Sequence, residues 1–425
     1  MAEVLPINGL HFRLGDAGVG AADDVLAPPY DVLDDAGRQE LLDRSPYNAV
    51  AVDLPVPPEG EPGDRYAWAA KLLADWEREG KLERDDEPAI WVLTQDYVGP
   101  DGEKHTRHGF LARVRVTHYG AGLVRPHERT QPGPKEDRLK LTRATKFNLS
   151  PIFSLYTGNA WPILQPFLDS DPWATATDAD GTVNRIWKVT DREVHDEITR
   201  ALAPSELLIA DGHHRYETSR IYAEEIGGDG DHRYTLMCLV SLEDPGLTVY
   251  GTHRLIGGLA ADPERQEALG KAVRDLFTID VVDAEHLDPT GTDGVGVFGY
   301  VNARTGGMYR LTLKDPAILD LILGEARSEA YRRLDAVLIE ELIFKGALGM
   351  SAADVEAKQG IGYAKSINEV LAKTSEDGPF EAAFILRPTP VDQVQSVADA
   401  GETMPPKSTF FFPKVPTGIV FNPLG

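Results

Sequence analysis

The chain has 425 residues, of which 42% are hydrophobic and 26% charged, and its formal net charge is -25. This length exceeds what one hydrophobic core serves and predicts two or three domains. The acidic charge repels a polyphosphate backbone, so we expect no nucleic-acid partner. No stretch approaches the ~20 apolar residues of a membrane span. Because the N-terminus also lacks a signal-peptide pattern, we expect a cytoplasmic protein without a membrane partner.

We predict that residues 1–120 form a mixed α/β region. Helical spacing runs over 35–46 and 64–82, and β-prone runs over 88–98 and 108–119 are joined by the turn-rich GPDGEKH as a hairpin. In APPYDVL (27–33), Pro29 holds the preceding residue extended. We therefore expect this segment to present Tyr30 and Asp31 from a loop.

We predict that residues 121–260 form the chemically active core. The apolar run 207–210 is followed by Asp211-Gly212 and then by a helical stretch over 213–228 that ends in two glycines. A helix N-terminus after a strand receives anions, and glycine lets the backbone approach a ligand closely. The predicted phosphate- or donor-binding residues are Gly212, His213, His214 and Arg215. Asp211 is expected to act in catalysis, by capping the helix or by holding a metal ion bound to the phosphate; the alternative is a solvated histidine pair behind an N-cap.

Further basic and acidic stretches belong to this core. In RPHERT (125–130), Glu128 stands between cations that favour its ionised form; a self-neutralising surface turn is the alternative. The segment 135–151 reverses the local sign of charge, with Lys140, Arg143 and Lys146 expected on one broad side of a helix. It either focuses the field on an anionic ligand, with Arg143 and Lys146 adding to the donor site, or forms a solvated face.

The end of the core and the third region, 261–425, carry fewer signals. The runs 234–242 and 247–256 flank Asp-Pro-Gly and predict a hairpin, within which Cys238, the only cysteine, is expected to be a small buried hydrophobe. A single cysteine excludes an intramolecular disulfide. The pair His253-Arg254 and the lysines Lys407 and Lys414 around three phenylalanines are, each taken alone, more often structural than functional.

Taken together, the strings APPYDVL, RPHERT, KEDRLKLTRATKFNLSPIFSLY, ADGHHRYETS, GTHRL and MPPKSTFFFPK resemble a prokaryotic family known as a domain of unknown function, over nearly the whole chain. The central portion resembles the ParB/sulfiredoxin-like superfamily, some members of which are free-serine kinases. The resemblance implies an α/β (α+β mixed), multi-domain protein with such a module at 121–260. It also implies phosphorylation of free L-serine, or the reverse reaction, with Glu128 activating the hydroxyl.

The resemblance implies Mg²⁺, held at Asp211, and ATP, ADP or pyrophosphate as phosphoryl donor. The residues that we assign to the serine or phosphoserine site are the neighbours within the same motifs: His127, Arg129, Thr130, Asp31, His253 and Arg254. Two other interpretations remain open: a ParB-like nucleotide switch or DNA-associated adaptor, and a phosphoserine phosphatase.

Overall fold

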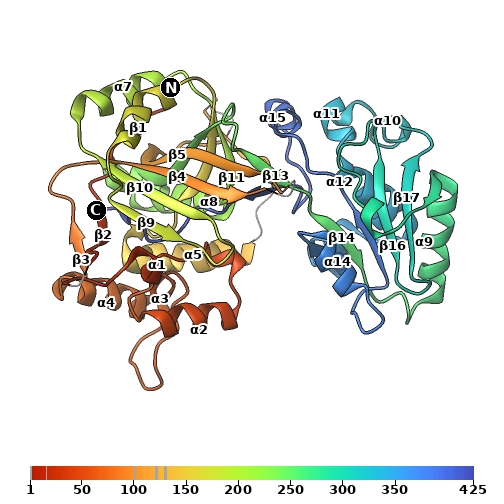
Figure 1. Ribbon diagram of the computed structural model, residues 1–425, viewed down its shortest axis with the longest axis horizontal. Coiled ribbons are helices and arrows are strands. Elements are labelled where there is room, and N and C mark those ends of the chain that lie inside the picture. The colour runs from red at the N-terminus through yellow and green to blue at the C-terminus, as the bar shows by residue number, and fades with distance from the viewer. Residues whose placement is uncertain (1, 16, 100–101, 120–122, 129–131) are drawn as a thin grey trace. The chain divides into compact units, whose positions relative to one another are not determined.

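The computed structural model describes residues 2–15, 17–99, 102–119, 123–128 and 132–425. Contacts within the chain define two compact units. Unit 1 comprises Met1–Pro126, Thr130–Thr248 and Pro413–Gly425, and unit 2 comprises His127–Arg129 and Val249–Phe412. In Figure 1, unit 1 carries the red to green elements and the last blue segment; the chain enters unit 2 twice, at His127–Arg129 and over Val249–Phe412, and returns to unit 1 at Pro413.

Unit 1 contains a sheet that has nine strands within the described residues, in the order β6-β11-β8-β12-β5-β4-β10-β9, with β1 beside β5. The pairs β11·β6 and β12·β8 are parallel, and the other pairs are antiparallel. The strands are β1 (Val4–Leu5), β4 (Ile90–Val98), β5 (Lys104–Arg115), β6 (Val124–Arg125), β8 (Ile152–Tyr156), β9 (Ala174–Thr177), β10 (Val183–Val189), β11 (Leu207–Asp211) and β12 (Tyr234–Ser241).

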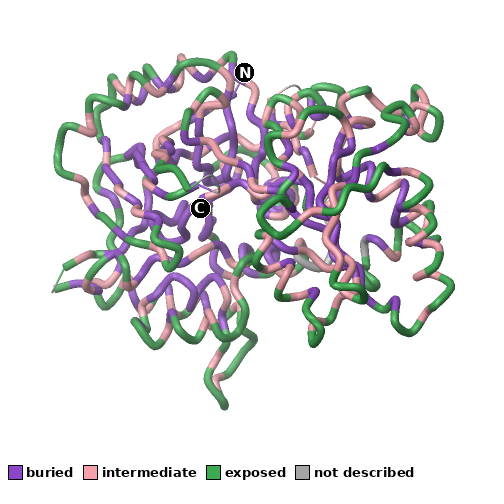
Figure 2. The backbone as a smooth tube through the Cα atoms, turned by 45° about the vertical axis from the view of Figure 1, so that its right-hand side comes forward, coloured by how far each residue is buried: buried purple, intermediate pink, exposed green. Residues whose placement is uncertain are grey.

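The core of unit 1 forms around this sheet. Alternate residues of the strands, such as Phe110 and Leu239, pack with Ile198 and Leu202 of α7 (Arg192–Leu202) in one apolar cluster. A second cluster gathers the N-terminal helices around Trp76 and the C-terminal Phe421. Figure 2 shows buried residues mainly in the inner stretches of the backbone tube and exposed residues along its outer turns.

The helices of unit 1 surround these clusters. They are α1 (Ala22–Val25), α2 (Asp35–Arg44), α3 (Val50–Asp53), α4 (Arg65–Arg78), α5 (Pro132–Thr145), α6 (Trp161–Leu164), α7 and α8 (His213–Ile226), with the 3₁₀ turns η1 (Tyr30–Val32), η2 (Gln165–Asp169) and η3 (Asp231–Arg233). The short strands β2 (Leu10–Phe12) and β3 (Leu82–Arg84) pair together, as do β7 (Phe147–Asn148) and β21 (Asn422–Pro423).

Unit 2 is built on a sheet of six strands, all antiparallel, in the order β15-β17-β16-β19-β14-β18 among its described residues. The strands are β14 (His253–Ile256), β15 (Phe277–Val281), β16 (Val297–Asn302), β17 (Gly307–Leu313), β18 (Ile361–Ala364) and β19 (Ala382–Ile385). Leu255, Val301 and Ile385 lie in its apolar core.

The helices of unit 2 are α9 (Pro263–Leu276), α10 (Ile318–Leu323), α11 (Glu329–Arg332), α12 (Asp335–Leu338), α13 (Ala352–Glu356), α14 (Ile367–Lys373) and α15 (Val391–Asp399). Shorter turns are η4 (Ala284–His286) and η5 (Gly324–Ala326), and a π-helical stretch, η6, runs over Ile339–Ala347. Among the described helices of the whole chain, none combines the length and apolarity needed to cross a membrane.

The structure confirms the mixed α/β class and the presence of more than one unit. Helices α2 and α4, the hairpin β4–β5 and the strand–turn–helix β11–α8 all form where the sequence predicts them. The division into three regions at 120 and 260 and the ParB/sulfiredoxin-like module remain predictions. Residues 1–119 and most of the expected core belong to the same unit.

The hairpin expected over 234–256 is wrong. Both edges of β12 are already occupied by β5 and β8, so no third strand can join it. The next strand, β13 (Thr248–Tyr250), pairs instead with β20 (Phe410–Phe412). The Asp-Pro-Gly turn therefore lies close to the boundary between the units rather than inside a hairpin.

Candidate functional site

The strand–turn–helix from β11 to α8 forms because each part has a local cause. Leu207–Ala210 are buried in the sheet, and the pairing with β8 shifts register between Ile209 and Asp211. Gly212 caps α8 in the left-handed conformation, with φ 93°. A Cβ at this position would lie only 3.0 Å from Nε of Arg215. The left-handed backbone therefore favours glycine, and a Cβ would in addition require the side chain of Arg215 to shift slightly.

Asp211 lies between two cations. Its Oδ2 is 3.2 Å from Nζ of Lys414 and 3.6 Å from Nη2 of Arg215, and its Oδ1 accepts a hydrogen bond from the Gly212 N–H at 3.0 Å. Burial alone would raise the pKa of Asp211, but Lys414 and Arg215 lower it well below its usual range. The carboxylate is therefore ionised at neutral pH and its charge is compensated within unit 1.

Arg215 is buried, with 9% of its surface exposed. Its Nη1 donates to the carbonyl of Pro151, whereas Nε and Nη2 have no hydrogen-bond partner in the described part of the chain. Burial opposes its charge, but Asp211 and Asp31 raise its pKa above the ordinary value. Buried guanidinium N–H groups are normally hydrogen-bonded, so these two nitrogens are the unsatisfied donors of the turn.

A second buried arginine lies near the first. Arg138 of α5 donates to the carboxylate of Asp53 at 3.0 Å, and Ser150 donates to the other oxygen of the same carboxylate at 2.7 Å. The ring of Tyr30 lies 4.1 Å from the guanidinium of Arg138 and 6.0 Å from that of Arg215. Burial raises the pKa of Tyr30 to about 12, so its hydroxyl stays protonated at neutral pH.

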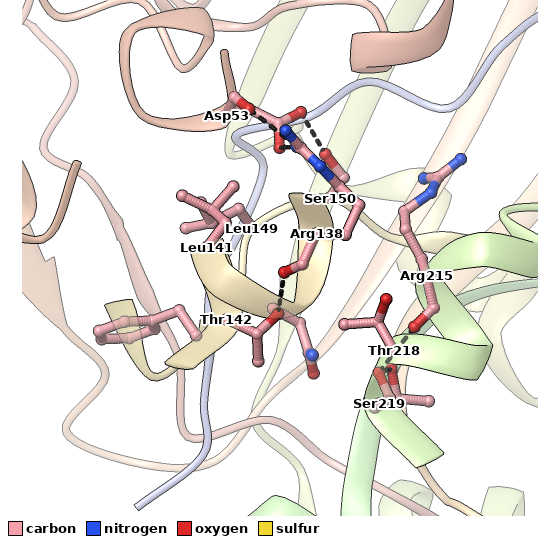
Figure 3. A pocket seen from close by; sticks show the side chains of 12 residues that line it. Asp53, Arg138, Leu141, Thr142, Leu149, Ser150, Arg215, Thr218 and Ser219 are labelled. Atoms are coloured by element: carbon pink, nitrogen blue, oxygen red, sulfur yellow. Dashed lines mark hydrogen bonds and ion pairs between the residues drawn. The ribbon is translucent and has the colours of Figure 1, made fainter. Parts of the chain in front are cut away.

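Between α5 and α8 lies a cavity of about 40 Å³, lined in part by Thr142, Ser150, Thr218 and Ser219. Figure 3 shows Arg138 pointing to Asp53 and Ser150, and the guanidinium of Arg215 extending away from Thr218 and Ser219. This volume corresponds to a few water molecules.

The other predicted residues of unit 1 divide into two groups. Two of them act electrostatically on the turn: Asp31 raises the pKa of Arg215, and His213 lowers the pKa of Asp211. Arg143 instead pairs with Glu225, with an Nε–Oε2 distance of 3.0 Å, about 18 Å along α8 from its start. Lys146 follows the end of α5 with φ 59° and is exposed, so the expected single helical face of Lys140, Arg143 and Lys146 is wrong.

Unit 2 holds His127, Glu128, His253 and Arg254. Glu128 accepts a hydrogen bond from the Lys407 N–H at 3.1 Å, and buried His127 lies 2.8 Å from the hydroxyl of Thr409. His253 accepts from the Leu386 N–H, and burial lowers its pKa to about 4, so it is neutral at neutral pH. Arg129 and Thr130 lie outside the described residues.

The predicted magnesium site does not fit the residues around Asp211. Both carboxylate oxygens are already engaged, and two cations compensate its charge. Within the described ranges, no three His, Cys, Asp or Glu residues form a group that could hold a metal ion. We therefore assign no step to a metal ion.

The sequence does not reveal the partners of these groups. The sequence alone favours a structural role for Lys414, yet its ammonium compensates the charge of Asp211. In the sequence, Arg138 is one of several basic residues of the segment 135–151, but in the structure it is buried and paired with Asp53. The signal for Arg138 is its spacing from Leu141, which places both on the inward side of α5.

The fold and these contacts define a mixed α/β protein of two units, with an under-bonded arginine at a strand–turn–helix. The chain belongs to the family described as "Protein of unknown function (DUF1015)", whose model matches residues 4–337. The kind of family that the motifs resemble is thereby confirmed. A comparison with curated proteins gives no match.

The solved structures that are similar to this chain include the following three. A conserved hypothetical protein from Pyrococcus furiosus is 15% identical, with 70% of this chain and 90% of that chain covered and a TM-score of 0.35. A free serine kinase in complex with AMP is 14% identical, with coverage of 73% and 94% and a TM-score of 0.35. SbnI from Staphylococcus aureus, truncated at its C-terminus, is 12% identical, with coverage of 69% and 82% and a TM-score of 0.33. Likenesses this low carry no argument about chemistry.

Proposed function

We propose that the protein transfers a phosphoryl group between a small donor and the hydroxyl of free L-serine, in either direction. The observation that carries the proposal is Arg215, a buried guanidinium at a glycine-capped helix start with two nitrogens that lack hydrogen-bond partners in the described structure. A phosphate oxygen would satisfy these donors at the positive end of the helix. Serine is the acceptor to test first because the sequence motifs resemble those of free-serine kinases.

In the forward direction, the serine Oγ attacks the terminal phosphorus of the donor. The bond from phosphorus to the leaving oxygen breaks, and AMP, ADP or phosphate departs with the electron pair when the donor is ADP, ATP or pyrophosphate. Glu128 takes the hydroxyl proton. Gly212, His213, His214 and Arg215 hold the transferred group, and Asp211 orients Arg215. Phosphoryl transfer mainly requires positioning and neutralisation of charge, which these groups supply.

Glu128 belongs to unit 2 and the Asp211–Arg215 turn to unit 1, so each assignment is tested by itself. Asp31 is proposed to contact the substrate because it lies within electrostatic reach of Arg215. For His253 and Arg254, the buried contacts with backbone groups favour support of the site over contact with serine.

The experiment is a donor screen. The protein is incubated with L-serine and ATP, ADP or pyrophosphate, with and without Mg²⁺, and O-phosphoserine is measured by mass spectrometry. We expect product with one donor and, in the reverse assay, donor regeneration from phosphoserine and the matching leaving group. Hydrolysis of phosphoserine without an acceptor would instead indicate a phosphatase. Absence of turnover with every donor in both directions would refute the proposal.

A further inference from the structure

A turn of unit 2 contacts the carboxylate of Glu128. The segment 404–408 runs beside His127-Glu128: Met404 N–H donates to the His127 carbonyl at 2.7 Å, and Glu128 and Met404 form a parallel bridge. Three residues further on, the Lys407 N–H donates to Oε1 of Glu128 at 3.1 Å. The turn therefore fixes both the backbone and one carboxylate oxygen of the proposed base.

Lys407 makes this contact from an unfavourable conformation. Its φ is 60°, in the left-handed region, which a lysine rarely adopts. Such a residue persists only where its surroundings hold it in place. The lysine side chain is exposed, so its own burial does not explain the conformation.

Arg254 holds the 404–408 turn by hydrogen bonds to its backbone carbonyls. This arginine of β14 is 3% exposed, and its Nη1 donates to the carbonyls of Thr252 at 2.9 Å and Lys407 at 3.0 Å. Its Nη2 lies 3.4 Å from the carbonyl of Pro406, and its guanidinium is 4.9 Å from the ring of Tyr363. A single side chain thus ties the strand to two consecutive carbonyls of the turn.

Arg254 is also a buried cation that makes no ion pair with a carboxylate of the described chain. Burial lowers its pKa, and the groups that oppose this effect are Tyr363, Glu340 and Glu128. The charged groups that act on Arg254 or its neighbour Tyr363 thus include the cation Lys407 and the anions Glu340 and Glu128. A neutral side chain would fill this buried space without the desolvation free energy that a charge costs. We therefore expect the retained charge of Arg254 to act on its neighbours.

We propose that Arg254 is a positioning residue for Glu128: it holds the 404–408 turn, through which the Lys407 N–H orients the carboxylate, and its charge favours the ionised form. The consequence for catalysis rests on the proposed function, because it requires Glu128 to be the base. The effect on the ionisation of Glu128 does not depend on any activity.

The test measures that ionisation directly. The full-length protein is labelled with ¹³C at the glutamate side-chain carboxyl, and Glu128→Gln assigns the Glu128 signal in an NMR titration. Arg254→Met removes the cation, and we expect the Glu128 midpoint to rise by about one pH unit. Lys407→Gly keeps the N–H, suits the left-handed conformation and removes only an exposed cation, so its midpoint should rise by less than that of Arg254→Met.

Two further variants exclude a general loss of structure. Leu255→Ala removes a buried apolar side chain from the same strand and should leave the midpoint unchanged. If Arg254→Met does not fold, Arg254→Gln, which retains an N–H donor, replaces it with the same expectation. An unchanged midpoint in whichever neutral variant folds would overturn the proposal.

The activity assay gives a second readout. Because Glu128 must be ionised to accept a proton, a higher midpoint moves the acidic limb of kcat/KM upward in pH by the same amount. Leu255→Ala should keep the wild-type limb. If the wild type shows no phosphoryl transfer, the proposed function fails, while the NMR midpoints still decide the role of Arg254.

Discussion

The ammonium of Lys414 lies 3.2 Å from the carboxylate of Asp211, although 203 positions separate the two residues in the chain. This contact ties the C-terminal segment to the end of β11. It also lets Asp211 remain ionised in a buried setting, where it in turn faces Arg215. The pair thus connects the return of the chain to unit 1 with the proposed phosphate-binding turn.

The first prediction concerns this pair. Lys414→Met should reduce the free energy of unfolding by about 2 kcal/mol, because a largely buried carboxylate loses a charged hydrogen-bond partner. Urea unfolding at pH 7 measures the loss. Asp211→Asn provides the second arm of a double-mutant cycle, in which we expect a coupling of about 1 kcal/mol or more. Strictly additive losses would mean that the two groups do not interact.

The pair also predicts a pH dependence. The pKa of Asp211 is lowered in the folded protein, so its stabilising contribution is present above the unfolded value of about 3.9 and is lost as pH falls toward the lower folded value. The difference in stability between the wild type and Lys414→Met should therefore narrow below about pH 4.

The second prediction concerns Arg215. Arg215→Lys keeps a charge but loses the planar fork, so we expect kcat/KM to fall about 10-fold to 1000-fold. Arg143→Lys is the matched control, since Arg143 pairs with Glu225 at the other end of α8. Steady-state kinetics and calorimetric donor affinity measure both variants. Unchanged kinetics in a folded Arg215→Lys protein would remove the turn from the site, and an equal loss in Arg143→Lys would place Arg143 in it.

The third prediction separates the base from the phosphate-binding turn. Glu128→Gln keeps the shape of the side chain but cannot accept a proton, so transfer should fall by about 10²–10⁴ while donor affinity remains nearly intact. Glu128→Asp should give an intermediate rate. If Glu128→Gln retains full transfer, the base lies elsewhere, and Asp31 is the next residue to test. A parallel loss of donor affinity would assign Glu128 to donor binding instead.

The sequence predicts the strand–turn–helix because its causes are local. Four apolar residues end at Asp211-Gly212, and the helix stops at Gly227, as the structure confirms. The contact of Lys414 with Asp211 is not predictable, since no local pattern relates residues so far apart. The predicted hairpin of β12 and β13 fails for the same reason. The Asp-Pro-Gly turn signal is strong, but it is local and does not determine which strands pair with β12, and these are β5 and β8.

The basic segment gives the fourth prediction. Lys140 pairs with Glu136 at 3.4 Å and Arg143 with Glu225, so part of its charge is already neutralised, and the whole chain carries -25. Duplex DNA should therefore bind weakly and without sequence preference even at low salt. Fluorescence anisotropy with two unrelated duplexes measures this. Tight, sequence-selective binding at about 0.15 M salt would favour the adaptor interpretation.

The fifth prediction concerns a row of polar side chains across three neighbouring strands of the large sheet and the turn after β9. Arg107 of β5 donates to Oε1 of Gln95 at 3.1 Å, Gln95 donates to Asn184 at 2.8 Å, and Asn184 donates to Asp178 at 2.9 Å. Arg107 is 1% exposed, and burial lowers its pKa to about 10. Asp178 lies at the other end of the row, where burial raises its pKa to about 6.

Asp178→Asn should remove a pH-dependent cost of folding. The folded pKa of Asp178 lies above its unfolded value of about 3.9, so its contribution to stability is greatest below pH 4 and is lost as pH rises through about 6. The variant should match the wild type near pH 4 and exceed its free energy of unfolding by about 1–3 kcal/mol at pH 8. Urea unfolding across this range measures the difference. Asp171→Asn, at an exposed position, should follow the wild type throughout, and a variant of Asp178 that does the same would show that this carboxyl is ionised without cost.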